Sequence, residues 1–281
     1  MLTLLNYYYL WKINSEQHDS TKATLSDSRF KIIEAFVLFT LIFVGLEGIM
    51  ATQRNRGENI LFIGNSYTYE NDGVDQHLSA LLNSTNSNAT YRFVTRAAEG
   101  KYHLCTHWHD AETQTLFNSR RWDKIILQEY NSGPLKEIEE FNEYAERWKN
   151  LIKSTNNNTK IYLLSTWKYR SATGMEDRLF SAYTDLSKKI NAGVIPVGHL
   201  WKSLEGKVDL YDEDGAHPNR KGTFLTACLF YEQMFGKNVT LTNNTDEIIS
   251  DSMQTKLKKW AHEFNHSANN HLAQNLIRSS S

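Results

Sequence analysis

The chain has few cysteines and no excess of charge of either sign, and both shortages exclude classes of protein. Its 281 residues include two cysteines, Cys105 and Cys228, which are too few for a disulfide framework. Each lies in an apolar helical pattern, where a buried free thiol is the commoner outcome, although a single bond between them stays open. The 31 Lys and Arg residues balance 32 Asp and Glu residues. The composition therefore indicates neither nucleic acid nor an anionic membrane surface as a partner.

Long hydrophobic runs are also scarce, and the most continuous one lies near the N-terminus. Residues 35–46 (AFVLFTLIFVGL) are apolar without interruption. The run is shorter than the roughly 20 residues that cross a bilayer and is close in length to a signal-peptide core. Residues 1–51 are therefore predicted to carry a cleaved signal peptide, with Ala51 near the cleavage site, or a signal anchor that attaches the chain to a membrane through residues 32–50. A buried core helix is the alternative.

This segment predicts a protein of the secretory pathway, either secreted or membrane-anchored. Sequons for N-glycosylation are compatible with export, and they lie at Asn83, Asn88, Asn157, Asn238, Asn243 and Asn265. Roughly four such matches arise by chance in a chain this rich in Asn, Ser and Thr, so the sequons decide little.

After residue 51, short apolar runs alternate with longer amphipathic ones. Strands are predicted at 60–63, 91–94, 124–127, 161–164 and 194–197, and helices at 74–83, 103–117, 138–152, 176–190, 219–235 and 246–275. Alternation of this kind indicates a parallel sheet with helices on both faces. Five strands are enough for a flavodoxin-like three-layer α/β/α sandwich, which is the predicted fold.

A serine follows the first predicted strand directly, in Gly64-Asn65-Ser66-Tyr67-Thr68. Gly64 permits a tight turn, and a serine at that turn can present its hydroxyl to solvent while its own N–H is available to an oxyanion. Parallel sheets bind ligands at the carboxyl ends of their strands, so topology and chemistry indicate the same edge. An ordinary turn or helix cap, which Asn and Ser favour, is the alternative.

A carboxylate and a histidine lie three positions apart in Asp214-Gly215-Ala216-His217-Pro218. Pro218 favours an extended conformation for His217 and itself suits the first turn of the helix that follows. Asp214 can then bond one ring nitrogen of His217 and leave the other to face Ser66. These are the parts of a Ser-His-Asp acyl-transfer site, with a capping Asp and a surface His as the alternative. The chain lacks the G-x-S-x-G pattern, which argues against the α/β-hydrolase fold.

The two motifs together resemble the SGNH (GDSL-like) hydrolase superfamily, and more closely its branch whose first block reads GNSxT. The resemblance covers about residues 58–236, and residues 237–281 are expected to be a helical extension that packs on the same domain. The family's fold is the flavodoxin-like sandwich, and its members are esterases, lipases and carbohydrate deacetylases. The resemblance implies a serine esterase without a cofactor, in which Ser66 is the nucleophile, His217 the general base and acid, and Asp214 the orienting carboxylate.

The resemblance also suggests which groups stabilise the oxyanion. Two donors would be the N–H groups of Ser66 and of Gly100, which matches the glycine of the family's second block. The third block departs from the family's Gly-x-Asn-Asp and reads Leu127-Gln128-Glu129-Tyr130-Asn131. The side-chain amide of Gln128 is the expected third donor, with Asn131 as the alternative.

Two further groups of residues bear on the site. Potential metal ligands cluster at His103, Cys105, His107, His109 and Asp110. Leu104 occupies the place of a zincin's catalytic Glu and no second ligand group is evident, so no metal site is expected. Trp167, at the end of the fourth strand, either lines the acyl or sugar pocket or packs in the core.

The substrate that the resemblance implies is a short-chain acyl ester, for instance an acetyl group on a carbohydrate. Two other functions stay open. The same triad can transfer the acyl group to another alcohol, and the same scaffold can serve a non-catalytic glycan-binding protein.

Overall fold

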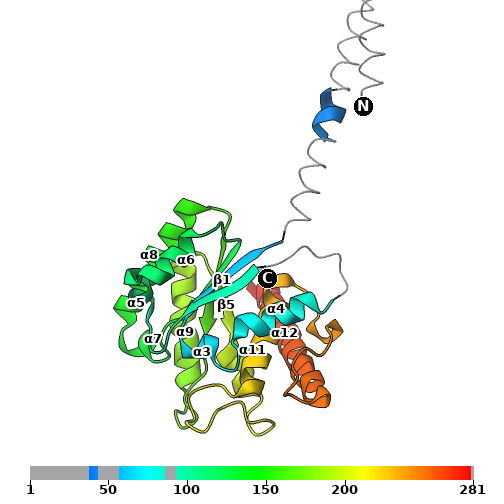
Figure 1. Ribbon diagram of the computed structural model, residues 1–281. Coiled ribbons are helices and arrows are strands. Elements are labelled where there is room, and N and C mark those ends of the chain that lie inside the picture. Colours follow the sequence, from blue (N-terminus) through cyan, green and yellow to red (C-terminus); the bar gives the residue numbers. More distant parts are fainter. Residues whose placement is uncertain (1–37, 44–56, 86–92, 280–281) are drawn as a thin grey trace, which may run out of the picture. The chain divides into compact units, whose positions relative to one another are not determined.

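The computed structural model of the chain describes residues 38–43, 57–85 and 93–279, with side chains up to residue 267 (Figure 1). Most of the predicted signal segment and the sequon at Asn88 lie outside the described residues. Within the described part, no helix is both long enough and apolar enough to cross a membrane. Residues 57–281 form one unit, which contains the whole sheet.

Five parallel strands form one sheet in the order β2-β1-β3-β4-β5 (Figure 1). They are β1 (Asn59–Gly64), β2 (Phe93–Ala98), β3 (Lys124–Leu127), β4 (Lys160–Ser165) and β5 (Gly193–Pro196). β1 and β3 are buried on both faces, which explains why both read as apolar runs. The order is that of the flavodoxin-like fold, so the predicted fold class is confirmed. The strand order reverses between β1 and β3, and ligands bind at such a point.

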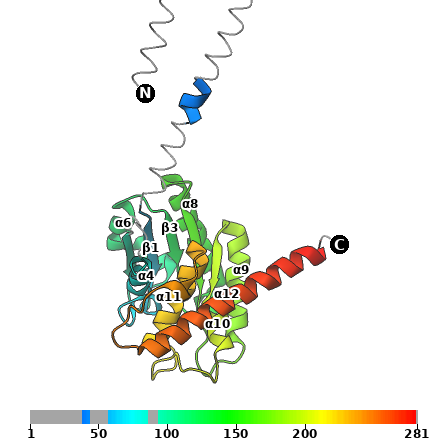
Figure 2. The ribbon, with the colours of Figure 1, turned by 90° about the vertical axis from the view of Figure 1, so that its right-hand side faces the viewer.

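Helices cover both faces of the sheet. They are α3 (Ser66–Tyr69), α4 (Val74–Asn83), α5 (Leu104–His109), α6 (Ala111–Asn118), α7 (Gly133–Lys136), α8 (Ile138–Thr155), α9 (Met175–Ile190), α10 (Val197–Ser203), α11 (Arg220–Phe235), the 3-10 turn η1 (Val239–Leu241) and α12 (Asp251–Ser279). Ile60 and Phe62 of β1 face a core formed with α4, α10 and α11, whereas Leu61 and Ile63 face a core formed with α5, α8 and α9. α12 packs against α11 on the outside of the first core (Figure 2).

Several elements differ from the sequence prediction. The second strand is described over 93–98, so it extends beyond the predicted end at residue 94, and residues 91 and 92 lie outside the described residues. The helix predicted at 103–117 is divided in two, because Asp110 ends α5 and caps α6. The Asp110 carboxylate accepts the backbone N–H of Thr113 at 2.7 Å, which favours a new helix start over continuation of the old one.

The start of α11 also differs, and it positions the loop that precedes it. Pro218 lies before the helix rather than in its first turn, because Asn219 is the N-cap and accepts the Gly222 N–H at 3.2 Å. The Asn219 side chain also donates to the carbonyl groups of Asp209 (3.0 Å) and Tyr211 (2.9 Å). One capping residue thus fixes both the helix start and the loop 209–218.

Both cysteines are free thiols. Cys228 is buried in α11, and burial raises its pKa far above the usual range. Cys105 is half-buried in α5, where burial, together with a hydrogen bond from its Sγ to the Glu140 carboxylate, raises its pKa to about 11. Both groups therefore stay protonated and poorly nucleophilic at neutral pH.

Candidate active site

The candidate nucleophile, Ser66, follows a glycine, Gly64, that a larger residue cannot replace without a steric clash. Ser66 begins α3 directly after the end of β1, and Asn65 caps this short helix with its side-chain oxygen. A Cβ on Gly64 would lie 2.5 Å from the Thr68 hydroxyl and 2.6 Å from the side-chain oxygen of Gln128. These separations are far inside van der Waals contact. Gly64 is therefore required by close packing rather than by a backbone conformation that only glycine adopts.

The structure brings together the three residues that the two motifs supply. The Ser66 hydroxyl oxygen lies 2.9 Å from Nε2 of His217, and Nδ1 of His217 lies 2.5 Å from Oδ2 of Asp214. The other Asp214 oxygen accepts the backbone N–H groups of Ala216 and His217, both at 2.9 Å. A carboxylate accepts hydrogen bonds only, so these partners assign the imidazole proton to Nδ1 and leave Nε2 to accept from the serine.

Hydrogen bonds and solvent stabilise the negative charge of the Asp214 carboxylate. The hydrogen bond from His217 is the main cause that lowers the pKa of Asp214 to about 2, and the two backbone N–H groups act in the same direction. About half of the Asp214 side chain is exposed, so water also supports the ionised form. Asp214 is therefore a carboxylate throughout the neutral range, as an orienting group must be.

Asp214→Asn is expected to lower the urea midpoint of unfolding at pH 5, and this difference from the wild type is expected to shrink towards pH 2. A carboxylate whose folded-state pKa is depressed stabilises the fold above its unfolded pKa of about 3.9, and that stability is lost as the pH falls through the folded value. Midpoints measured at pH 5, 3 and 2 test this. A difference that stays constant over that range would contradict it.

The loop after β2 contacts the nucleophile turn. The side chain of Asn65 donates to the carbonyl of Tyr102 at 3.0 Å, and a Cβ on Gly100 would lie 3.3 Å from the Tyr69 hydroxyl. Gly100 is thus placed beside the short helix that Ser66 begins. Its role as an oxyanion donor, together with the Ser66 N–H, stays a prediction.

Gln128 has a different task from the one expected. Its NH₂ group donates to the side-chain oxygen of Asn65 (3.0 Å) and to the carbonyl of Glu129. Its oxygen accepts the N–H of Asn65 (2.9 Å) and the hydroxyl of Thr68 (3.0 Å). Both hydrogens and both acceptor positions of the amide are therefore occupied. The expectation that Gln128 completes the oxyanion hole is wrong in this arrangement, because its amide is bonded to Asn65 and Thr68 and stabilises the turn that they form.

Comparison with known proteins bears on the fold. No protein-family model matches the chain, and no curated protein matches it. Solved structures do match. A protein described as an SGNH hydrolase from Slackia heliotrinireducens is 23% identical, with 64% of this chain and 100% of that chain covered and a TM-score of 0.54. A DUF4886 family protein from Bacteroides uniformis is 17% identical, with 74% and 94% covered and a TM-score of 0.57.

An acetylxylan esterase from Geobacillus stearothermophilus is also similar, at 13% identity, with 64% of this chain and 95% of that chain covered and a TM-score of 0.53. The chain has the SGNH-hydrolase fold. At these identities the likeness concerns the fold, and the chemistry must be argued from this chain's own residues.

In this SGNH fold, Trp167 is part of the core and does not line a pocket. It is 1% exposed and lies between two aromatic rings, with centroids 4.7 Å from Tyr67 and 4.1 Å from Trp201. Its indole N–H donates to the carbonyl of Ala216 at 2.9 Å, one residue before His217. The rings of His217 and Tyr67 in turn pack in an edge-to-face arrangement, with centroids 5.4 Å apart. Of the two roles left open by the sequence, core packing is the one observed, and Trp167 also holds the histidine loop.

Asn131, the alternative oxyanion donor, contacts Tyr67 of the same aromatic stack. Its NH₂ group donates to the Tyr67 hydroxyl at 2.8 Å, and its oxygen accepts the Thr166 hydroxyl at 3.0 Å. Burial is the main cause that raises the pKa of Tyr67 far above its usual range, so the phenol stays neutral. Asn131 therefore supports the tyrosine on which His217 rests.

His107 is a supporting residue that the sequence did not reveal. It is buried, and its Nε2 donates to the Gly64 carbonyl at 2.6 Å while Nδ1 lies 2.9 Å from the Thr113 hydroxyl. Burial lowers the pKa of His107, which favours the neutral ring. In the sequence it stood out only as one of the potential metal ligands between His103 and Asp110. Its effect is to fix the backbone just before the nucleophile.

The other members of the suspected metal cluster have separate partners. His103 pairs with Glu129 at 2.8 Å, and His109 contacts the Tyr144 hydroxyl at 3.2 Å. Cys105 bonds to Glu140, as described above, and Asp110 caps α6. These contacts stabilise local structure, and His103 also lies 3.3 Å from the carboxylate of Glu137.

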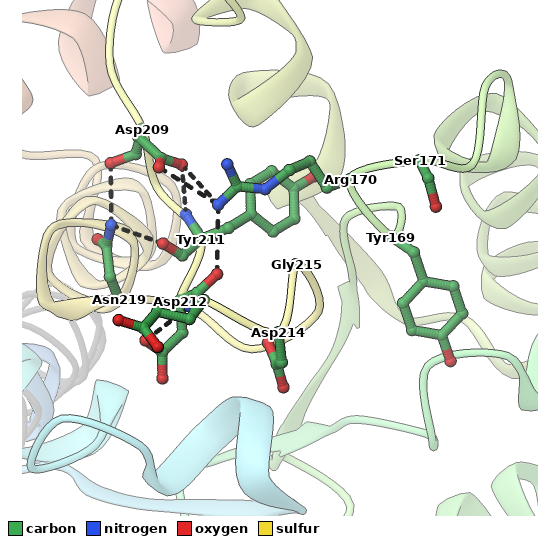
Figure 3. Close-up of a pocket in the computed structure, with 10 residues that line it drawn as sticks. Tyr169, Arg170, Ser171, Asp209, Tyr211, Asp212, Asp214, Gly215 and Asn219 are labelled. Carbon is green, nitrogen blue, oxygen red and sulfur yellow. Dashed lines mark hydrogen bonds and ion pairs between the residues drawn. The ribbon is translucent and has the colours of Figure 1, made fainter.

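A cavity of about 990 Å³ adjoins the triad beside Asp214 (Figure 3). Its lining includes four carboxylates, those of Asp209, Asp212, Glu213 and Asp214, and one cation, Arg170. Arg170 is held by Asp209 at 3.2 Å and by the carbonyl of Asp212 at 3.2 Å.

Two tyrosines complete the walls of this cavity. The guanidinium of Arg170 lies 5.2 Å from the ring centre of Tyr211, and Tyr169 also lines the cavity (Figure 3). The cavity is therefore polar and acidic, with aromatic rings in its walls. It is lined by Asp214, which bonds to His217, and His217 bonds to Ser66.

Proposed function

We propose that the chain is a serine ester hydrolase that cleaves a short-chain acyl ester. The observation that carries this proposal is the unbroken hydrogen-bond chain from Ser66 through His217 to Asp214, with heavy-atom separations of 2.9 and 2.5 Å. A nucleophile bonded to a base, which is itself oriented by a third group, is the arrangement that activates a serine hydroxyl. It stands at the carboxyl edge of the sheet, where this class of fold binds ligands.

The reaction follows from this arrangement. The Ser66 oxygen attacks the ester carbonyl while Nε2 of His217 takes its proton, and ionised Asp214 stabilises the imidazolium. The N–H groups of Ser66 and Gly100 would face the oxyanion. His217 then protonates the leaving alcohol as the carbon–oxygen bond breaks, which leaves an acyl-serine. Water, deprotonated by the same imidazole, attacks the acyl-serine, and the acid is released as Ser66 recovers its proton.

A hydroxyl-rich alcohol, such as a carbohydrate, is proposed as the leaving part of the ester. The cavity beside Asp214 supports this, because carboxylates, Arg170 and tyrosine hydroxyls can bond to sugar hydroxyls and its rings can stack on sugar faces. A long acyl chain would find few apolar groups there. The similarity in fold to an acetylxylan esterase points in the same direction.

Export of this enzyme, as a secreted or membrane-anchored protein, is also proposed. The apolar sequence of residues 35–46 supports it. N-terminal sequencing of the protein from its native cells, with fractionation of membranes, distinguishes a cleaved signal from an anchor.

The full chain is expected to hydrolyse p-nitrophenyl acetate faster than p-nitrophenyl octanoate and to react with a fluorophosphonate at Ser66. Hydrolysis is followed by absorbance, and the labelled serine is located by mass spectrometry. A folded chain that hydrolyses neither ester and leaves Ser66 unlabelled would contradict the proposal and favour a glycan-binding role. Added sugar acceptors would reveal acyl transfer as a second product.

A further inference from the structure

A carboxylate and two imidazoles converge between α11 and α12, away from the residues of the triad. Glu232 comes from α11, and His262 and His266 come from α12. Each offers one ligand atom, and the three atoms lie within 4.8 Å of one another. The proposed ester hydrolysis uses none of these groups.

Glu232 is buried and held in one orientation. It is 3% exposed, and one of its oxygens accepts the backbone N–H of Val239 at 2.7 Å while the other accepts the side chain of Asn265 at 3.2 Å. Neighbouring donors of this kind orient the carboxylates that bind metals. The carboxylate also contacts Nδ1 of His262 at 2.8 Å, a partner that is cationic only when it is protonated. A buried carboxylate is costly without a positive partner.

The two histidines are placed to act as a pair. They are four residues apart on one helix, so they lie on the same face. Their ring centres are 4.3 Å apart. His262 is half-buried against Glu232, whereas His266 is exposed. The group therefore includes one ligand, His266, that is accessible from solvent.

We propose that Glu232, His262 and His266 form a binding site for a divalent late transition-metal ion, with zinc as the ion that fits best. Two imidazole nitrogens and one carboxylate oxygen form a typical zinc ligand set, and water can take the fourth position. Magnesium and calcium prefer ligand sets made of oxygen alone. Zinc–ligand bonds of about 2.0–2.2 Å place ligand atoms about 3.3 Å apart around a tetrahedral ion, so binding draws the three atoms together. Rotation of the exposed His266 side chain can supply most of this movement.

The ion would supply the positive charge that the buried carboxylate needs. It would also join α12 to α11, the helix that starts directly after the His217 loop. An ion that binds the folded chain and not the unfolded one raises stability by mass action. The proposed role of the ion is therefore to hold the C-terminal helix α12 against α11.

A second group of potential ligands serves as an internal comparison. His103, Glu137 and Glu140 also lie close together, but they offer one imidazole and two exposed carboxylates. Imidazole suits zinc better than carboxylate does, and exposed carboxylates are well solvated without an ion. Zinc is thus expected at the α11–α12 group in preference to this one.

The test is zinc binding by the full chain, purified without a polyhistidine tag and freed of metal with a chelator. Isothermal titration with zinc chloride is expected to show one tight site per chain, and magnesium chloride none. With free zinc at about 100 times its dissociation constant, the thermal midpoint should rise by about 5–10 °C. His266→Ala should weaken zinc binding at least about ten-fold and remove this shift, and its ester hydrolysis without zinc should match that of the wild type.

Two variants separate this site from other histidines. His109→Ala removes an exposed histidine of α5 and should bind zinc as the wild type does. Glu232→Gln keeps an oxygen for the Val239 N–H but loses the charge, and should weaken zinc binding if its folded circular dichroism spectrum is retained. Absence of saturable zinc binding, or tight binding that survives His266→Ala and is lost in His103→Ala, would overturn the proposal.

Discussion

Ser66→Ala is expected to lower kcat for p-nitrophenyl acetate by at least about 10⁴-fold, close to the uncatalysed rate. The change removes the atom that attacks the ester and leaves binding contacts in place, so kcat should fall far more than KM changes. Alanine suits the first position of a helix, so the fold should be retained. The measurement is steady-state hydrolysis of freshly purified protein, with circular dichroism to verify folding.

Ser171→Ala is the matched control for this variant. Ser171 is an exposed serine at the wall of the acidic cavity, and no step of the proposed mechanism uses its hydroxyl. Its kcat should stay within about two-fold of the wild type, as expected for a surface change. If Ser66→Ala retained more than a tenth of the wild-type kcat, Ser66 would not be the nucleophile.

Trp167→Ala is expected to lower the free energy of unfolding by about 3–5 kcal/mol. The substitution would open a cavity between Tyr67 and Trp201 and leave the Ala216 carbonyl without its indole donor, which adds to the cost. Trp167→Phe keeps an aromatic ring but loses the indole donor and part of the buried volume. It should therefore be destabilised less, and its kcat should still fall because the His217 loop is no longer held.

Urea unfolding at neutral pH measures these stabilities. Trp260→Ala provides a control, because Trp260 is a partly buried tryptophan of α12, distant in sequence from the triad loop. It should lose less stability and keep its kcat. A loss below about 1 kcal/mol in Trp167→Ala would show that the stack does not stabilise the domain.

The fold could be predicted from the sequence because its signals are local. The run at 60–63 is apolar throughout and the run at 124–127 is apolar after Lys124, as is typical of strands buried on both faces, and each is followed by an amphipathic helix. The pairing of Asp214 with His217 is likewise local, since three residues and a proline set their geometry. Ser66 could be joined to them because strand ends meet at one edge of a parallel sheet.

The supporting residues could not be assigned because their partners are distant along the chain. Gln128 carries the amide expected of an oxyanion donor, but its direction is set by Asn65, 63 positions earlier. Trp167 has the right position at a strand end, and its burial depends on how Trp201 of α10 packs against it. His107 could not be given a structural role from the sequence, because its partner, the carbonyl of Gly64, lies 43 positions earlier. The sequence motifs predict which residues react, and tertiary packing decides which other residues hold them in place.

The loop 209–218 also bears on how such an enzyme can change over evolution. Its backbone and the Asp214 side chain hold His217, whereas the Asp212 and Glu213 side chains are exposed at the cavity wall. Under the proposed function, the side chains that would recognise the alcohol thus lie next to those that would carry the acid–base chemistry. Descendants of this sequence can exchange the two outer carboxylates and acquire new ester preferences while the acid–base machinery is inherited unchanged.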